Sequence, residues 1–298
     1  FVAFASCVLC FGAAEVRSGL GLAVSCGQDR VARVWDLERG ECLRELRGHS
    51  SAVCFASSDW STQRLLTCGY DQALCLWDLR TGALMREAQG VARVGSKDSV
   101  CVDWREGQVL LGTMEGRLQL WNIEHGRGRE LRGHRSCVDM VLAGAGRALT
   151  ASRDKTLRLW DLKKGKCLRV LTGHSGSVQC GAVDWTSEQV LSASFDRTLR
   201  LWRSNEARVM RGHTDFVLCL AVEWPSHRAL SGGRDGLRLW DLENAKALKE
   251  MRAGAVPCVS MEWASQRAVT GGTVVRLWDL RGGEVLVEFV GPAGGLLV

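Results

Sequence analysis

Proline and tyrosine are scarce in this sequence, with three prolines and one tyrosine among 298 residues. So few prolines exclude the long proline-rich segments that stay extended or disordered. Long hydrophobic runs are also missing, because no apolar stretch reaches the roughly 18 residues that a membrane-spanning helix needs. Apolar residues make up 46% of the chain and charged residues 24%, the composition of a folded globular protein. We therefore expect a protein that does not enter a membrane.

The opening segment "FVAFASCVLCFGAA" (1–14) is apolar but lacks both an initiating Met and a basic flank. A secretory signal carries such a basic flank. We interpret this segment as an apolar inner strand of a truncated first repeat. The missing Met indicates that the sequence is a segment of a longer protein.

The net charge is small, at +6. A nucleic-acid groove needs denser basic clustering, so the excess favours an acidic or phosphorylated protein partner over nucleic acid. The sequence also has no GxxxxGK[ST] loop that would cradle a nucleotide phosphate. We expect no cofactor.

Tryptophan, in contrast, is abundant, and its positions reveal an internal repeat. Seven of the twelve tryptophans close segments such as "RVWDL" and "RLWDL", at successive spacings of 42, 44, 39, 42, 38 and 38 residues: Trp35, Trp77, Trp121, Trp160, Trp202, Trp240 and Trp278. The other five stand in "SDW", "VDW", "VEW" and "MEW": Trp60, Trp104, Trp185, Trp224 and Trp263.

Each repeat has the pattern of four short strands. In 173–211, "SVQCGAVDW", "QVLSAS", "TLRLW" and "ARVM" are strand-like, and "SFDRT" is typical of a hairpin turn. A single sheet of this size cannot bury both its faces, whereas seven sheets packed radially can. The sequence therefore predicts an all-β protein, a seven-bladed β-propeller of four-stranded antiparallel blades.

The Gly-His at one end of each repeat and the Trp-Asp at the other resemble WD40 repeats over roughly residues 1–291. The resemblance implies a single propeller domain over 1–298, with blades at about 1–47, 48–89, 90–132, 133–172, 173–211, 212–251 and 252–291. Propellers of this family commonly close when an N-terminal strand completes the last blade. Here 284–291 already has the pattern of the outer strand of blade 7, so either the ring closes without strand exchange or preceding residues were removed.

His174, Ser192 and Asp196 match the residue types of a hydrolase triad. The set recurs around the ring, however, whereas a nucleophile needs one site with an oxyanion hole. The resemblance implies a buried structural tetrad instead, so we expect no catalytic residue and no enzyme. The complete sets are His49–Thr67–Asp71–Trp77, His134–Thr150–Asp154–Trp160, His174–Ser192–Asp196–Trp202 and His213–Ser231–Asp235–Trp240. Blades 1, 3 and 7 lack one or more members.

Function in a repeat scaffold is expected where the copies differ. In WD-repeat propellers the residue before the turn Asp and two inner-strand positions project from the top face, where peptides often bind. These positions in blades 4–6 hold aromatic, aliphatic and basic residues typical of interfaces: Arg153, Phe195, Phe216, Leu218 and Arg234. Tyr70 on blade 2 is a separate candidate. The alternative is an ordinary surface in which the phenylalanines cover turns.

Most of the thirteen cysteines occupy equivalent repeat positions, as small buried apolar residues do. The lone Cys7-x-x-Cys10 has neither a second pair nor nearby histidines, so we expect no metal. A reduced, cytoplasmic protein follows, with the nucleus as the alternative compartment. Arg33, Arg158, Arg200, Arg238 and Arg276 each stand two residues before a blade Trp, and we expect structural ion pairs there.

We predict a non-catalytic interaction scaffold or adaptor that binds a protein or peptide on the top face. Narrower alternatives are a substrate-recognition subunit of a ubiquitin ligase and a ciliary or centriolar scaffold. An enzyme site in the central channel ranks lower, because no polar cluster is unique to one blade. The sequence does not specify an oligomeric state.

Overall fold

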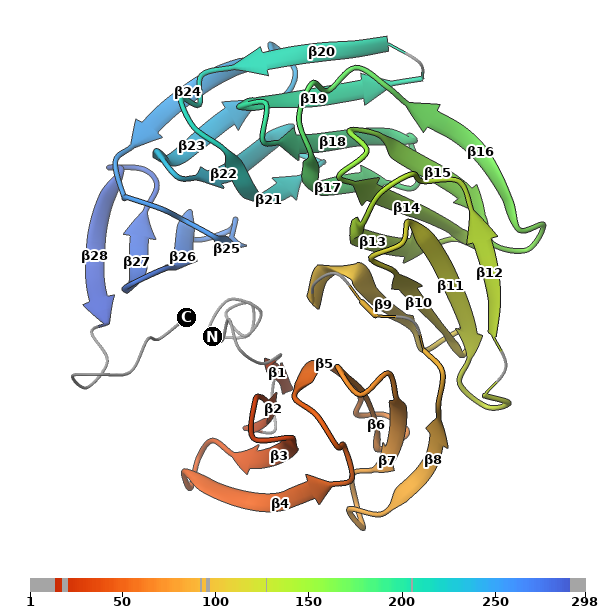
Figure 1. Ribbon diagram of the computed structural model, residues 1–298. Coiled ribbons are helices and arrows are strands. Elements are labelled where there is room, and N and C mark those ends of the chain that lie inside the picture. Colours follow the sequence, from red (N-terminus) through yellow and green to blue (C-terminus); the bar gives the residue numbers. More distant parts are fainter. Residues whose placement is uncertain are drawn as a thin grey trace.

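The computed structural model describes residues 14–17, 21–91, 93–94, 97–126, 128–204 and 206–289. They form seven four-stranded antiparallel sheets, which are arranged as blades around a central axis (Figure 1). The predicted seven-bladed β-propeller is confirmed. The apolar segment 1–13, with Cys7 and Cys10, lies outside the described residues.

Blades 1 to 4 follow each other along the chain. Blade 1 contains β1 (Ala14–Arg17), β2 (Leu22–Cys26), β3 (Val31–Asp36) and β4 (Glu41–Arg47). Blade 2 contains β5 (Val53–Asp59), β6 (Arg64–Gly69), β7 (Leu74–Asp78) and β8 (Leu84–Ala88). A short 3-10 turn, η1 (Lys97–Ser99), leads into blade 3, which contains β9 (Val100–Asp103), β10 (Gln108–Gly112), β11 (Arg117–Asn122) and β12 (Gly128–Arg132). Blade 4 contains β13 (Val138–Gly144), β14 (Arg147–Ser152), β15 (Leu157–Asp161) and β16 (Lys166–Leu171).

Blades 5 to 7 complete the described ring. Blade 5 contains β17 (Val178–Asp184), β18 (Gln189–Ser194), β19 (Thr198–Arg203) and β20 (Glu206–Arg211). Blade 6 contains β21 (Val217–Glu223), β22 (Arg228–Gly233), β23 (Gly236–Asp241) and β24 (Lys246–Met251). Blade 7 contains β25 (Cys258–Glu262), β26 (Arg267–Gly271), β27 (Val275–Asp279) and β28 (Glu284–Phe289).

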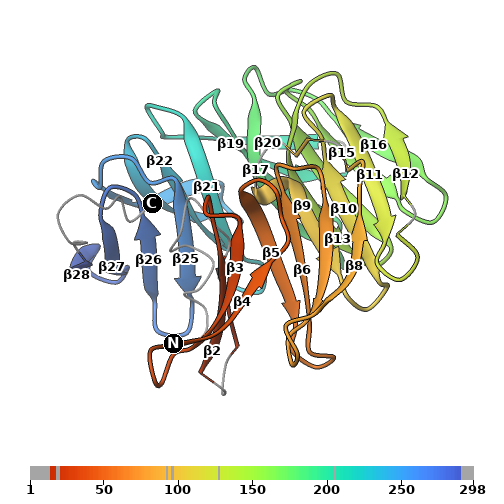
Figure 2. The same ribbon diagram turned by 60° about the horizontal axis from the view of Figure 1, so that its bottom comes forward.

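Every sheet is built from four consecutive strands. The first strand of each blade lies nearest the axis and the fourth lies at the rim, while the turns gather at the two ends of the ring (Figures 1 and 2). Blade 7 follows the same rule, because β28 is its outer strand and pairs with β27. Within the described residues, therefore, blade 7 is formed without strand exchange.

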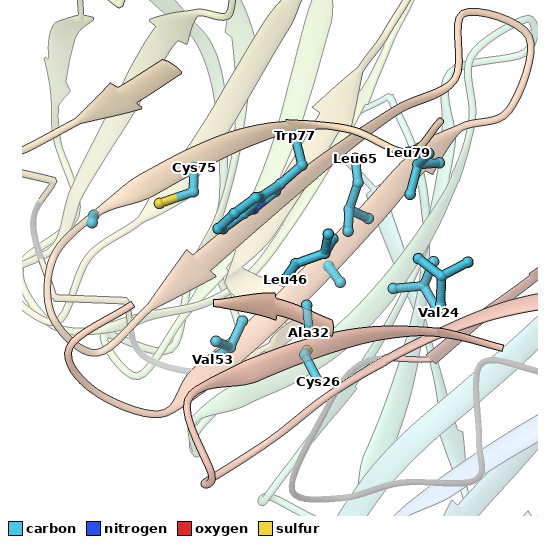
Figure 3. Close-up of a cluster of buried hydrophobic side chains, with 12 residues drawn as sticks. Val24, Cys26, Ala32, Leu46, Val53, Leu65, Cys75, Trp77 and Leu79 are labelled. Carbon is cyan, nitrogen blue, oxygen red and sulfur yellow. The ribbon is translucent and has the colours of Figure 1, made fainter. Parts of the chain in front are cut away.

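The hydrophobic cores lie between neighbouring blades. Successive side chains of a strand point to opposite faces of its sheet, so Leu65 of β6 packs toward blade 1 and Leu66 packs toward blade 3. Figure 3 shows the first of these clusters, in which Val24 and Leu46 of blade 1 meet Trp77 of blade 2. The middle strands read as continuous apolar runs because both of their faces are buried.

The outer strands face solvent, and all six residues of β28 are exposed. This explains why "ECLRELR" in β4 mixes charged and apolar residues without a regular buried side. Within the described ranges, no helix has the length and hydrophobicity required to cross a bilayer.

Replacing a core leucine tests how far the inter-blade packing stabilises the ring. Leu191 of β18 is 0% exposed in the core between blades 5 and 6. We expect Leu191→Ala to lower the free energy of unfolding by about 2–5 kcal/mol, because it opens a cavity in a packed core. Leu168→Ala on the outer strand β16, where the leucine is 52% exposed, should change it by less than about 0.5 kcal/mol. Urea denaturation followed by tryptophan fluorescence measures both, and equal effects would contradict this account of the core.

Candidate functional site on the top face

Blade 5 holds a closed chain of hydrogen bonds between its loop, its second and third strands, and the turn that joins them. His174 Nδ1 lies 2.7 Å from Asp196 Oδ2, and His174 Nε2 lies 2.8 Å from Ser192 Oγ. The indole N–H of Trp202 donates to the same hydroxyl oxygen at 2.8 Å. With the imidazole proton on Nδ1, Nε2 accepts the hydroxyl proton of Ser192, so every buried polar group is paired.

The same arrangement occurs in three other blades. Histidine Nε2 lies 2.6–2.8 Å from the hydroxyl oxygen, and the indole N–H lies 2.7–2.9 Å from it, in His49–Thr67–Asp71–Trp77, His134–Thr150–Asp154–Trp160 and His213–Ser231–Asp235–Trp240. The hydroxyl residues Thr67, Thr150, Ser192 and Ser231 are all 0% exposed. A substrate cannot reach a hydroxyl in this position, so the geometry does not suit a nucleophile.

The electrostatics of these sets favour a carboxylate beside a neutral imidazole. Burial by itself raises the pKa of the Asp196 carboxyl, but the hydrogen bonds from His174 and Thr198 outweigh it and hold that pKa well below its ordinary value. Burial lowers the pKa of His213, against the opposing effect of Asp235. Both shifts make the folded state lose stability as the pH falls.

The other blades keep only part of this network. In blade 1 the Trp35 indole N–H donates to Ser25 Oγ at 2.7 Å, and in blade 7 the Trp278 indole N–H donates to Thr270 Oγ1 at 3.0 Å. In blade 3 the Trp121 indole N–H donates to Gln119 instead, at 3.3 Å. The indole bond is thus retained where the histidine is absent.

The expected ion pairs of the repeated arginines form in three blades. Arg33 pairs with Glu45, Arg238 with Glu250, and Arg276 with Glu288, at 2.5–3.0 Å between nitrogen and oxygen. Arg200 instead lies near the ring of Trp202, 6.0 Å from its centroid. This repeated position therefore joins the third and fourth strands rather than forming a binding stripe.

The top face is the end of the ring that carries the turn between the second and third strands of each blade. A repeated backbone hydrogen bond fixes this turn over the start of the inner strand. The N–H of Phe195 donates to Ser177 O at 2.9 Å, that of Arg153 to Cys137 O at 3.0 Å, and that of Tyr70 to Ala52 O at 2.9 Å. The residue before the turn Asp is thus held at the same height in these blades.

Blades 5 and 6 share an aromatic stack on this face. The Phe195 ring, from the β18–β19 turn, lies parallel to the Phe216 ring at the entrance to β21, with centroids 4.4 Å apart and an angle of 11° between the ring planes. The Arg234 guanidinium lies over the Phe216 ring, 5.0 Å from its centroid. Such contacts hold a guanidinium in place while it stays exposed. Arg234 makes no ion pair with any residue that the structure describes.

Blade 4 contributes an arginine whose charge is already compensated. Arg153 binds Asp139 of β13 through Nε and a terminal nitrogen, at 3.0 and 3.1 Å, and the Gln179 amide donates to the same carboxylate at 3.3 Å. The Asp139 side chain is 5% exposed, whereas that of Arg153 is 53% exposed. Sequence reasoning assigned Arg153 to a partner but missed Asp139 as its internal counterion, although Asp139 occupies one of the inner-strand positions that face the top.

The remaining candidates are placed apart. Leu218, two residues beyond Phe216, is half-buried on β21. Tyr70 is 51% exposed on blade 2, which lies on the other side of the ring from blade 5 (Figure 1). The structure brings Phe195, Phe216 and Arg234 together, and it leaves Tyr70 outside their cluster.

Comparison with known proteins places the chain in a family. The family model for the WD domain, G-beta repeat (WD40), matches residues 40–78, 127–161, 165–203 and 204–241, about half of the chain. The chain belongs to the WD40 repeat family. In fold, this WD40 propeller is similar to the computationally designed Ika8 protein, with a TM-score of 0.79 and 21% identity over 95% of this chain and 87% of the other.

Several curated proteins are similar over part of the propeller. Angio-associated migratory cell protein of Homo sapiens is 28% identical over 59% of this chain and 41% of its own length. Cell division control protein 4 of Saccharomyces cerevisiae is 31% identical over 61% and 21%, respectively. WD repeat and SOCS box-containing protein 1 of Xenopus tropicalis is 35% identical over 37% and 29%. The matched region thus spans less than half the length of each relative.

Acid sensitivity tests the carboxylate of the blade 5 tetrad. Asp196 accepts hydrogen bonds from His174, Ser175 and Thr198, and its lowered pKa stabilises the fold above the pKa of an unfolded Asp, near 4. We expect Asp196→Asn to cost about 1–3 kcal/mol of unfolding free energy at neutral pH. This difference should shrink as the pH falls below about 4.

The matched control is Asp184→Asn, at the other end of the same blade. Asp184 caps an exposed turn through Thr186 and Ser187, so its replacement should cost less than the loss of Asp196. Chemical denaturation at neutral and acidic pH compares the two variants. A pH-independent loss for Asp196→Asn would contradict the role of its charge.

Proposed function

We propose that this WD40 propeller is a non-catalytic interaction platform that binds a segment of a partner protein across the top face of blades 4–6. The observation that carries the proposal is the stack of Phe195 and Phe216 beneath the Arg234 guanidinium. Half-buried aromatic rings beside an exposed arginine provide apolar contact area and a directed charge in one place, as interface hot spots do.

The chemistry of this cluster favours an acidic or phosphorylated partner. Arg234 has no carboxylate partner among the described residues, so an incoming carboxylate or phosphate would meet an uncompensated guanidinium that is already oriented. Arg153 is exposed but bound to Asp139, and we assign it the role of a second, weaker contact. Phe195, Phe216 and Leu218 would take an apolar side chain of the partner.

The propeller also suits a recognition subunit joined to other modules. One relative carries a SOCS box beside WD repeats, according to its name, and the matched region covers 29% of that protein. An interaction module attached to a second module is the arrangement of an adaptor, which supports a substrate-recognition subunit of a ubiquitin ligase as the second candidate. We place the protein in the cytoplasm, with the nucleus as the alternative, because its cysteines occupy repeat positions as small apolar residues.

Affinity capture from a cell lysate tests the position of the binding surface. The intact protein is compared with the variant Arg153→Ala/Phe195→Ala/Phe216→Ala/Arg234→Ala, after both are shown to melt alike. We expect the variant to lose specific partners by at least about tenfold, because it removes the aromatic anchors together with both charges.

The matched control is Tyr70→Ala/Met114→Ala, which removes side chains that are 51% and 50% exposed at the equivalent turn positions of blades 2 and 3. This control should retain the partners. If it loses them while the blade 4–6 variant keeps them, the binding surface lies around Tyr70. If neither variant loses a partner, the top face is not the binding surface.

A further inference from the structure

Blade 7 contains a cavity of about 650 Å³ where the complete blades hold their tetrad histidine. Its lining includes Ala253 and Gly254 from the loop before β25, Gly272 from the turn after β26, and Trp278 of β27. This volume lies within the range of small-ligand sites, about 300–1,000 Å³.

The cavity follows from a shorter loop. In blade 6 seven residues of chain separate Met210 from Val217, whereas in blade 7 five separate the equivalent Met251 and Val256. The equivalence rests on burial, because Met210, Met251, Val217 and Val256 are all buried at the same strand positions. The shorter loop has no Gly-His, so blade 7 lacks an imidazole above its tryptophan.

The groups that surround the histidine in complete blades are still present. In blades 2 and 6 the glycine two residues after the tetrad hydroxyl lies so close that an added Cβ would come within 2.6 Å of His49 Nδ1 and 3.0 Å of His213 Nδ1. The corresponding glycine of blade 7, Gly272, lines the cavity. Trp278 lines it as well, and in blade 6 the Trp240 ring lies against His213, with the centroids 6.1 Å apart.

One hydrogen-bonding position is also left open. The Thr270 hydroxyl is buried, at 2% exposure, and accepts the Trp278 indole N–H at 3.0 Å. In the complete blades histidine Nε2 occupies a second position on this hydroxyl, at 2.6–2.8 Å. No described residue takes that position on Thr270. The hydroxyl proton is therefore available to an incoming acceptor.

We propose that the blade 7 cavity binds an imidazole group, supplied by a histidine side chain of a partner peptide. The imidazole restores the hydroxyl–imidazole contact that the other blades make internally, and the remaining volume holds the flanking peptide backbone. Residues 1–13 and 290–298 contain no histidine, so neither terminal segment of this sequence can supply the group. This site is separate from the blade 4–6 surface and does not depend on that proposal.

The charges around the cavity select the neutral form of the imidazole. Arg252 and Arg276 line it, together with Glu288, which is paired with Arg276 at 2.5 Å. Arg252 is exposed and has no ion-pair partner among the described residues. In contrast to the complete blades, no tetrad aspartate is present to favour an imidazolium. Protonation of the ligand would also remove the lone pair that accepts the Thr270 hydroxyl proton.

The test is NMR of the intact protein with ¹⁵N-labelled tryptophan, titrated with imidazole, Gly-His-Gly or Gly-Ala-Gly. We expect imidazole and Gly-His-Gly to shift the indole N–H signal of Trp278 with a Kd on the order of millimolar, as befits so small a ligand, and Gly-Ala-Gly to leave it unchanged. Binding should be about tenfold weaker at about pH 5.5 than at about pH 8. The Trp240 signal is the internal control, because His213 already fills its site.

Variants distinguish this site from weak surface binding. Thr270→Val removes the hydroxyl and should abolish the Trp278 response, and Ala253→Leu, which fills the cavity while leaving Thr270 and Trp278 intact, should weaken it at least about tenfold. His213→Gly opens the equivalent site in blade 6 and should give the Trp240 signal a response to imidazole. A Trp278 signal unmoved at about 50 mM imidazole overturns the proposal. So does an equal response to both tripeptides, and a response to imidazole without Gly-His-Gly overturns the peptide as the occupant.

Discussion

Each blade of this propeller has two apolar faces, and neither can be buried without a neighbouring blade. The middle strands supply side chains to both faces at once, as Leu65 and Leu66 do from adjacent positions of β6. An isolated four-stranded sheet with this pattern would expose one face to water at a cost of about 25 cal/mol per Å² of apolar surface. The ring arrangement, the inter-blade cores and the solvent-exposed outer strands all follow from this constraint.

The buried hydrogen-bond chains orient the loops that the hydrophobic cores leave undetermined. Apolar packing is not directional, whereas the link from Trp202 through Ser192 and His174 to Asp196 sets the position of the turn after β18. That turn carries Phe195, so the tetrad of blade 5 holds one half of the aromatic stack, and the tetrad of blade 6 holds the other half beside Phe216 and Arg234. A structural network therefore positions the surface that we propose for binding.

The repeat of tryptophans was enough to predict the number of blades and their strands, because burial of both faces imposes a regular pattern on the sequence. The side-chain pairings on the top face were harder to predict. Phe195 and Phe216 could be assigned to this face, but their stacking depends on the distance between two blades, which no local pattern encodes. The pairing of Arg153 with Asp139 depends on rotamers on two strands. The missing Gly-His of blade 7 was visible in the sequence, yet only the structure shows that the shortened loop leaves its volume open.

The order of the strands within each sheet has a consequence for how such a chain can change. Every described blade completes its hydrogen-bond ladder within one continuous stretch of chain. Duplication of one stretch would therefore copy a whole blade, including its turns, without breaking a ladder elsewhere. Substitutions within one copy, such as the phenylalanine before Asp196 or the shortened loop before β25, alter one sector of the ring and leave the neighbouring ladders intact. The ring can thus diversify sector by sector, in the way that an assembly of interchangeable parts does.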